Sequence, residues 1–265
     1  MPSLIKDLAG FFLGGAPEAS KARRQATTPA QGDKTDEQRD DKKDAWWWET
    51  READRDAFAS SRHRAHLPRC KRTGRPLKIL ALHGRGSNND ITSIQLSSLE
   101  VPTRCVADLL SAPHDSSPQS DVFHMLSNRP FHQWGHDEKA LKGVLAYIER
   151  HGPYDGLYGF SQGAAVVTAL SKPGVAEGFG STRTWRFVIC ACGVPPPGDG
   201  TVDLPSLQIS GARDPFRSAS TALADVYEAP MLLEHAGGHE LPLKLRHDAK
   251  FKDVLDAFFD RALEL

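Results

Sequence analysis

The sequence has few cysteines and no long apolar run. Only 4 of its 265 residues are cysteine, and the sequence has no Cys-x-x-Cys motif paired with a second cluster of metal ligands. This spacing predicts neither a disulfide framework nor a metal site, so we expect reduced thiols in a cytoplasmic protein. Because no run approaches the length of a membrane span, we also expect no membrane-spanning segment.

The sequence also has little net charge. Lys and Arg together number 33 and Asp and Glu 34, which gives a formal net charge of −1. Residues 1–76 carry 16 basic and 12 acidic side chains, a balance of +4, and this leaves −5 for residues 77–265. A domain with that balance has no electrostatic attraction for nucleic acid, so we expect none as a partner.

Residues 1–76 differ in composition from the rest of the chain. The apolar stretch at their start is too short for a secretory signal, although an organelle transit segment is the alternative to a cytoplasmic location. The charge-dense stretch that follows cannot bury enough apolar surface to fold alone, so we expect a partly disordered extension used for targeting or docking. Trp46, Trp47 and Trp48 either dock on a partner or form a short helix on the chain's own domain, and we favour the helix.

Residues 77–265 alternate between strand-like and helix-like segments. Apolar runs predict strands, and apolar residues three and four apart predict helices. The expected strands are 77–82, 105–111, a strand ending at 158, 185–192, 204–210 and 231–235, and the expected helices are 137–151, 164–167 onward, 218–227 and 249–263. This alternation predicts an α/β fold, namely a mostly parallel sheet with helices on both faces.

One pentapeptide carries the first chemical signal. Residues 159–163 read Gly-Phe-Ser-Gln-Gly and lie between an expected strand and an expected helix. This is the context of a nucleophile elbow, a sharp turn that exposes the Ser161 hydroxyl while the small glycines leave room for strand and helix. Such a pentapeptide arises by chance in roughly one chain in ten of this length, so its neighbours must support the assignment.

Two further groups follow later strands of the expected sheet. Asp214 comes after the strand 204–210, and His239 comes after the strand 231–235. Parallel strands bring such loops together at one edge, and the order Ser, Asp, His is that of the α/β-hydrolase fold. We predict Ser161 as nucleophile, Asp214 as acid and His239 as base. As alternatives, Asp214 only caps a turn, or His235 is the base, although two preceding glycines give His239 more freedom to reach the serine.

The remaining parts of the expected site are an oxyanion hole and a pocket. The backbone N–H groups of Arg85 and Gln162 are predicted to hold an oxyanion. The stretch 115–135 reads as a loop over the serine, and we expect the pocket to be lined by His114, Phe123, Met125, Phe131 and Trp134. An apolar pocket wall of this kind favours an ester or thioester of a small to medium acyl group as substrate. We expect the reaction to need no metal or organic cofactor. The Arg85 side chain either binds an anionic group of the substrate or faces solvent.

Taken together, these motifs resemble the FSH-type serine hydrolases, α/β-hydrolases that include carboxylesterases and polyketide-releasing thioesterases. The resemblance covers residues 77–265 and rests on the motifs Leu82-His83-Gly84, Ala112-Pro113-His114, Gly152-Pro153-Tyr154-Asp155-Gly156, the pentapeptide, Gly211-x-x-Asp214 and Gly237-Gly238-His239-x-x-Pro242. It implies a nucleophile, acid and base at Ser161, Asp214 and His239. The sequence departs from the family at Arg85, where an aromatic residue is usual.

Other functions are compatible with the same residues. An acyltransferase and an acyl-protein-thioesterase-like enzyme share the triad and the acyl-enzyme. A non-catalytic binding protein is the alternative from another class, and it is disfavoured because all three triad residues and both elbow glycines are present.

Overall fold

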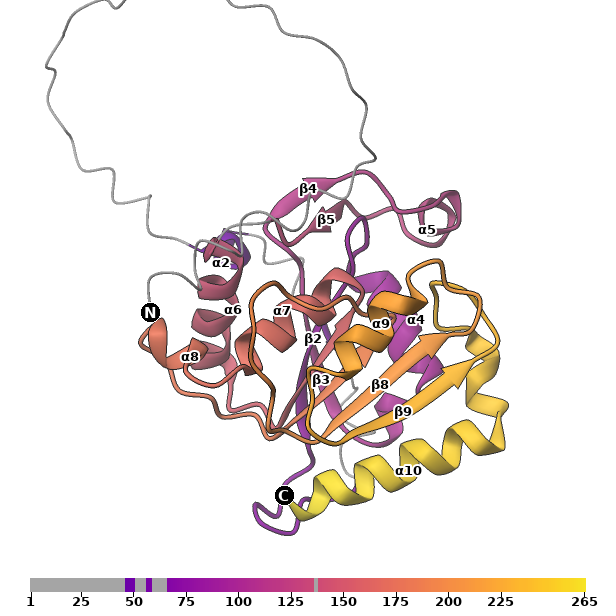
Figure 1. Cartoon of the computed structure of the whole chain (residues 1–265). Helices are drawn as coiled ribbons and strands as arrows, with labels where there is room; N and C mark the ends of the chain where they lie inside the picture. Colours follow the sequence, from indigo (N-terminus) through magenta and orange to yellow (C-terminus); the bar gives the residue numbers. More distant parts are fainter. Residues whose placement is uncertain (1–45, 51–55, 59–65, 136–137) are drawn as a thin grey trace, which may run out of the picture.

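A seven-stranded sheet forms the centre of the protein (Figure 1). The computed structural model describes residues 46–50, 56–58, 66–135 and 138–265, so our expectation for the first 45 residues lies outside the described part. The strand order is β1-β3-β2-β6-β7-β8-β9, in which β1 is antiparallel to β3 and the other six strands are parallel. The strands are β1 (Asp56–Phe58), β2 (Lys78–Leu82), β3 (Val106–Leu110), β6 (Gly156–Phe160), β7 (Phe187–Ala191), β8 (Ser206–Gly211) and β9 (Pro230–His235).

Helices cover both faces of this sheet. The described helices are α2 (Trp47–Thr50), α4 (Asn89–Ser98), α5 (Asp121–Leu126), α6 (Glu138–His151), α7 (Gln162–Ser171), α8 (Val175–Gly178), α9 (Arg217–Ala224) and α10 (Ala249–Glu264), with short 3-10 turns at Val101–Thr103 and Leu243–His247. Side chains of α2, α6, α7 and α9 form the core on one face, and those of α4 and α10 form it on the other. None of the helices in the described ranges combines the length and the apolar character that a bilayer crossing needs.

The two-sided core follows from the apolar runs of the strands. In β2, Leu80 and Leu82 belong to one core while Ile79 and Ala81 belong to the other, because successive side chains of a strand point to opposite faces. A strand that is buried on both sides must therefore be continuously apolar. The predicted α/β architecture is confirmed.

The segment between β3 and α6 is not the irregular loop that we expected. It forms a small hairpin of β4 (His114–Ser116) and β5 (Phe131–Gln133), with α5 between the two strands. Figure 1 shows this hairpin at the top of the described part of the molecule, away from α10. Helix α4 is not among the helices that we expected from the sequence. In the structure the Asn88 side chain caps α4 by accepting a hydrogen bond from the Ile91 N–H at 3.2 Å.

The tryptophan run lies on the chain's own domain, against α6. Trp47 and Trp48 are buried, and their indole N–H groups donate to the backbone carbonyls of Ser111 at 2.8 Å and Gly143 at 3.2 Å. A side chain at position 143 would collide with the Trp47 ring, so the glycine provides the space for it. The side chains of Trp47 and Trp48 therefore belong to the core.

We expect Trp48→Ala to lower the free energy of unfolding by about 3–5 kcal/mol, the usual cost of deleting a buried aromatic side chain. Trp48 is 2% exposed and packs edge-on against Tyr147 with ring centroids 5.3 Å apart. The partly exposed Trp46 is the matched control, and Trp46→Ala should cost clearly less. Urea unfolding of the full chain measures both, and a loss below about 1 kcal/mol for Trp48→Ala would contradict its place in the core.

Candidate active site

Ser161 occupies a strained turn between β6 and α7. Its backbone φ is +52° and its ψ is −115°, a conformation that is costly for any residue with a side chain. A Cβ at position 159 would lie 2.5 Å from the Ala164 nitrogen, and one at position 163 would collide with the Leu82 carbonyl. Only glycine fits at these positions, because α7 starts directly against the ends of β6 and β2. The turn has the geometry of a nucleophile elbow.

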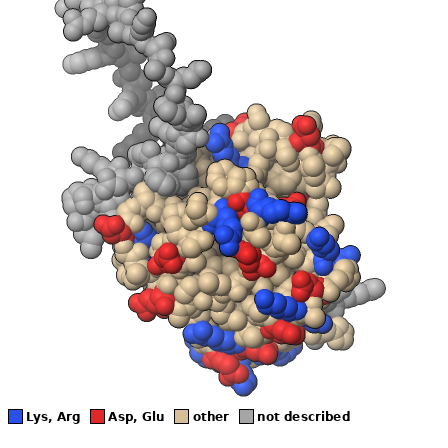
Figure 2. Space-filling view, turned by 45° about the vertical axis from the view of Figure 1, so that its right-hand side comes forward, with Lys and Arg blue, Asp and Glu red and all other residues tan. Residues whose placement is uncertain are grey.

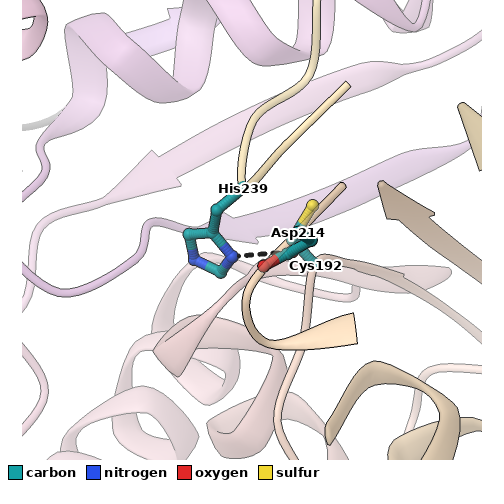
Figure 3. Close-up of side chains that lie close together, drawn as sticks. All are labelled: Cys192, Asp214 and His239. Carbon is teal, nitrogen blue, oxygen red and sulfur yellow. Dashed lines mark hydrogen bonds and ion pairs between the residues drawn. The ribbon is translucent and has the colours of Figure 1, made fainter. Parts of the chain in front are cut away.

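Asp214 and His239 meet Ser161 at the carboxyl ends of the sheet strands. The His239 Nε2 lies 3.0 Å from the Ser161 Oγ. On the other side of the ring, the His239 Nδ1 lies 2.8 Å from the Asp214 Oδ2 (Figure 3). The carboxylate can only accept, so Nδ1 carries the proton and Nε2 is free to accept one from the serine. The three side chains therefore form a continuous chain of hydrogen bonds.

The structure gives the contacts of His235 and Asp214, on which the two alternatives for the base and the acid depend. His235 lies in β9, where its Nδ1 accepts from the Gly237 N–H at 3.1 Å, so the structure brings His239 rather than His235 to the serine. Asp214 does cap a turn, since its Oδ1 accepts from the Phe216 N–H at 2.7 Å. The same carboxylate therefore uses one oxygen to fix its own loop and the other to orient the imidazole.

The imidazole is also held by aromatic neighbours. The rings of Phe160 and Phe216 lie 5.2 Å and 5.1 Å from the ring of His239, centroid to centroid. Phe216 was missed in the sequence, although its position two residues after the expected acid was an available signal.

The loop after β2 lies close to the elbow. A Cβ at Gly84 would lie 3.2 Å from the Ser161 Cβ, so this loop passes directly over the serine. Within the described chain no residue accepts a hydrogen bond from the backbone N–H of Arg85 or of Gln162. Gln162 follows Ser161 in the sequence, and Arg85 lies near it in space. The Gln162 N–H also lies at the positive end of α7. The arrangement has the parts of an oxyanion hole.

Trp134 supports this loop instead of lining a pocket. Its indole N–H donates to the His83 carbonyl at 2.8 Å, and its backbone N–H donates to the Gln162 side-chain oxygen at 2.9 Å. The side chain is fully buried. It therefore ties the loop after β2 to the first residue of α7.

His83 fixes the same loop from the core side. Its Nδ1 lies 2.7 Å from the Gly84 carbonyl, and its Nε2 accepts from the Ala112 N–H at 2.9 Å. Burial lowers the pKa of His83 from 6.5 to about 4, and the hydrogen bond to Gly84 opposes that shift. The imidazole is therefore neutral in the folded protein near neutral pH.

We expect the protein to lose stability as the pH falls from about 6.5 towards 4 because His83 binds a proton more weakly in the folded state. The unfolded chain takes up this proton first, so the contribution is intact above the unfolded pKa and is lost progressively below it. The full loss would reach about 3 kcal/mol. Urea unfolding at neutral and at mildly acidic pH measures the difference. In His83→Gln the dependence should be shallower, and an unchanged slope would contradict the assignment to His83.

A cleft of about 790 Å³ opens in front of the serine. Most of the side chains that line it are polar: Ser161, His239, Arg85, Asp115, Ser116, Ser117, Gln119 and Gln133, beside Gly86, Pro118 and Phe216. None of the five residues that we expected to line an apolar pocket is among those that line this cleft. Trp134 and Phe131 are buried, Met125 is 78% exposed on α5, and the hairpin directs Gln133 and the residues after β4 at the cleft instead of His114 and Phe123.

Cys192 lies close to the acid and the base (Figure 3). Its Sγ, the Asp214 carboxylate and a His239 ring nitrogen lie within 4.8 Å of one another, which is close enough for metal ligands. However, burial, with Asp214 adding to it, raises the pKa of the Cys192 thiol, and metal binding needs the thiolate. The Cys192 thiol is placed to donate to the Glu240 carbonyl at 3.6 Å, and Asp214 and His239 are bonded to each other. This donor set does not fit a metal ion.

The sequence is similar to known esterases. It matches the family described as "Serine hydrolase (FSH1)" over residues 72–251. Esterase FUS5 of Gibberella fujikuroi is 29% identical over 200 residues, which cover 67% of this chain and 85% of that protein. Esterase OVCA2 of Homo sapiens is 33% identical over 133 residues, which cover 46% of this chain and 57% of that protein. Among solved structures, a carboxylesterase from Mesorhizobium loti is 18% identical, with a TM-score of 0.48 over 68% of this chain and 88% of that chain.

Proposed function

The chain belongs to the FSH1 family of serine hydrolases, and from this premise we propose that it hydrolyses esters or thioesters of small to medium acyl groups through an acyl-enzyme on Ser161. The observation that carries the proposal is the chain of hydrogen bonds from Ser161 through His239 to Asp214, at 3.0 Å and 2.8 Å. The esterases among its relatives support the reaction class.

In the first step the Ser161 Oγ attacks the carbonyl carbon of the ester while the His239 Nε2 takes the serine proton. The carbonyl oxygen becomes an oxyanion, which the N–H groups of Arg85 and Gln162 stabilise. Asp214 holds the Nδ1 proton and stabilises the imidazolium that forms. The imidazolium then donates its Nε2 proton to the departing alcohol or thiol, and the acyl group stays on the serine oxygen.

In the second step a water molecule attacks the acyl carbon. His239 takes one proton from the water and the same oxyanion hole stabilises the second tetrahedral intermediate. Collapse of this intermediate releases the carboxylic acid and returns the proton to the Ser161 Oγ. Both steps use only side chains and backbone groups of the chain, so the reaction needs no metal or organic cofactor.

The test is hydrolysis of nitrophenyl esters and thioesters with acyl chains of increasing length, in the presence of EDTA. We expect turnover with the chelator present and the highest kcat/KM for short to medium chains, because Phe216 is the one large apolar side chain among the residues that line the cleft in the described structure. Loss of activity with EDTA would contradict the cofactor-free mechanism. Formation of the acyl-enzyme without release to water, but with release to an added alcohol or amine, would identify an acyltransferase instead.

A further inference from the structure

We propose that the preferred substrates are esters that carry a carboxylate, which the guanidinium of Arg85 binds in the catalytic cleft. The proposal rests on the proposed ester hydrolysis and names its substrate class. Arg85 is exposed, and it lines the same cleft as Ser161 and His239. A substrate that reaches the serine through this cleft therefore passes close to the positive charge of Arg85.

The charge on Arg85 is not used elsewhere in the described structure. No described acidic side chain forms an ion pair with Arg85, whereas Arg104 is paired with Glu100 and Asp256 and Arg186 is paired with Asp155. The cleft does contain one carboxylate, that of Asp115, and it lies 3.3 Å from the Nδ1 of His132. The guanidinium of Arg85 is therefore available to a ligand.

The rest of the cleft favours the same kind of ligand. Gln119 and Gln133 contribute side-chain amides, which can donate to a carboxylate. The ten-residue helix α7 begins at the elbow and adds the positive end of its dipole. These groups stabilise a negative charge without a second cation.

The residues that line the cleft favour a carboxylate as the anionic group of the substrate, and they disfavour a polyphosphate such as that of coenzyme A. Arg85 is the one Lys or Arg among the residues that line the cleft in the described structure. A single planar guanidinium matches one carboxylate through two parallel hydrogen bonds, while several phosphate charges would need several cations. The charged side chains of one face of the molecule alternate in sign and form no extended basic surface (Figure 2).

The experiment compares each acidic ester with its neutral amide of the same shape. Monoethyl adipate and ethyl adipamate place the charge on the acyl side, and acetoxyacetate and acetoxyacetamide place it on the alcohol side. For the wild-type full chain we expect kcat/KM to be roughly tenfold higher for the acid than for the amide in one of the two pairs, mainly through KM. A tenfold ratio corresponds to about 1.4 kcal/mol, which is reasonable for a charged hydrogen bond that solvent partly screens.

The variants locate the preference. Arg85→Gln should bring the acid-to-amide ratio close to one, and Arg85→Lys should keep part of it. Comparing ratios cancels any effect of the substitution on the backbone donor or on the serine itself. Arg213→Gln is the matched control, because Arg213 is exposed and adjacent to Asp214 but does not line the cleft. It removes the same charge and should keep the wild-type ratio.

The outcomes separate this proposal from the one on which it rests. Equal kcat/KM for acid and amide in both wild-type pairs would overturn the carboxylate site and leave ester hydrolysis standing. An equal drop of the ratio in Arg85→Gln and Arg213→Gln would also overturn it, because the preference would then come from net charge. If no ester is hydrolysed, the proposed function fails. The carboxylate site at Arg85 is then tested through its effect on the labelling of Ser161 by a fluorophosphonate. Adipate should slow this labelling in the wild type and not in Arg85→Gln, and absence of protection would overturn the site.

Discussion

Ser161→Ala is expected to lower kcat for ester hydrolysis by on the order of 10⁴-fold or more. The serine Oγ is the group that forms the acyl-enzyme, and no other hydroxyl among the described hydrogen-bond partners of His239 can replace it. The activity that remains would come from the oxyanion hole and from substrate binding alone. Steady-state kinetics with a nitrophenyl ester measures the loss.

The variant should keep its fold, because alanine occupies less space than serine and meets the same backbone conformation at φ +52°. Urea unfolding is the control, and the free energy of unfolding should lie within about 0.5 kcal/mol of the wild type. A folded Ser161→Ala protein that retains a tenth or more of the wild-type kcat would exclude the serine as nucleophile.

Asp214→Asn is expected to lower kcat by on the order of 10³-fold to 10⁴-fold while the protein stays folded. The Phe216 N–H donates to one carboxylate oxygen at 2.7 Å, so the asparagine will keep its carbonyl oxygen at that position. Its NH₂ group then faces the Nδ1 of His239, which must become the acceptor. The ring proton moves to Nε2 and points at Ser161, so His239 can no longer take the serine proton.

The control for this variant is Asp225→Asn, which removes one exposed carboxylate at the end of α9 and should leave kcat close to the wild-type value. The pH profile adds a second readout, because a wrong tautomer lowers kcat/KM at every pH near neutrality and is not repaired by raising the pH moderately. If Asp214→Asn retained more than about a tenth of the wild-type kcat, Asp214 would be a turn cap and not the acid of a triad.

The parts of the fold that could be predicted from the sequence are those with local signals. Apolar runs marked the parallel strands, and the position of Ser161, Asp214 and His239 just after strands predicted that they would meet. A parallel sheet gathers such loops at one edge, so three distant residues could be combined without knowledge of the packing. The structure places the three side chains in contact, and their catalytic roles stay a prediction until the variants are measured.

The parts that could not be predicted depend on long-range packing. Nothing in the local pattern shows that Gly143 leaves space for the Trp47 ring, about a hundred residues away in sequence, so the place of Trp47 in the core could not be predicted from it. The wall of the cleft depends on how residues 114–133 fold back as a hairpin around α5. In this hairpin the aromatic Phe131 packs inward while Gln133 reaches the cleft, so the apolar composition of this stretch does not show which of its side chains line the cleft.

Covalent labelling of the full chain with a fluorophosphonate, followed by peptide mass spectrometry, tests the central claim most directly. The probe reacts with a serine only where a neighbouring base has activated the hydroxyl, as the contact between Ser161 and His239 implies. We expect one phosphonate per molecule, located on the peptide that contains Ser161, and none in Ser161→Ala. A wild-type protein that stays unlabelled, or that is labelled at another residue, would contradict the assignment of Ser161 as the nucleophile.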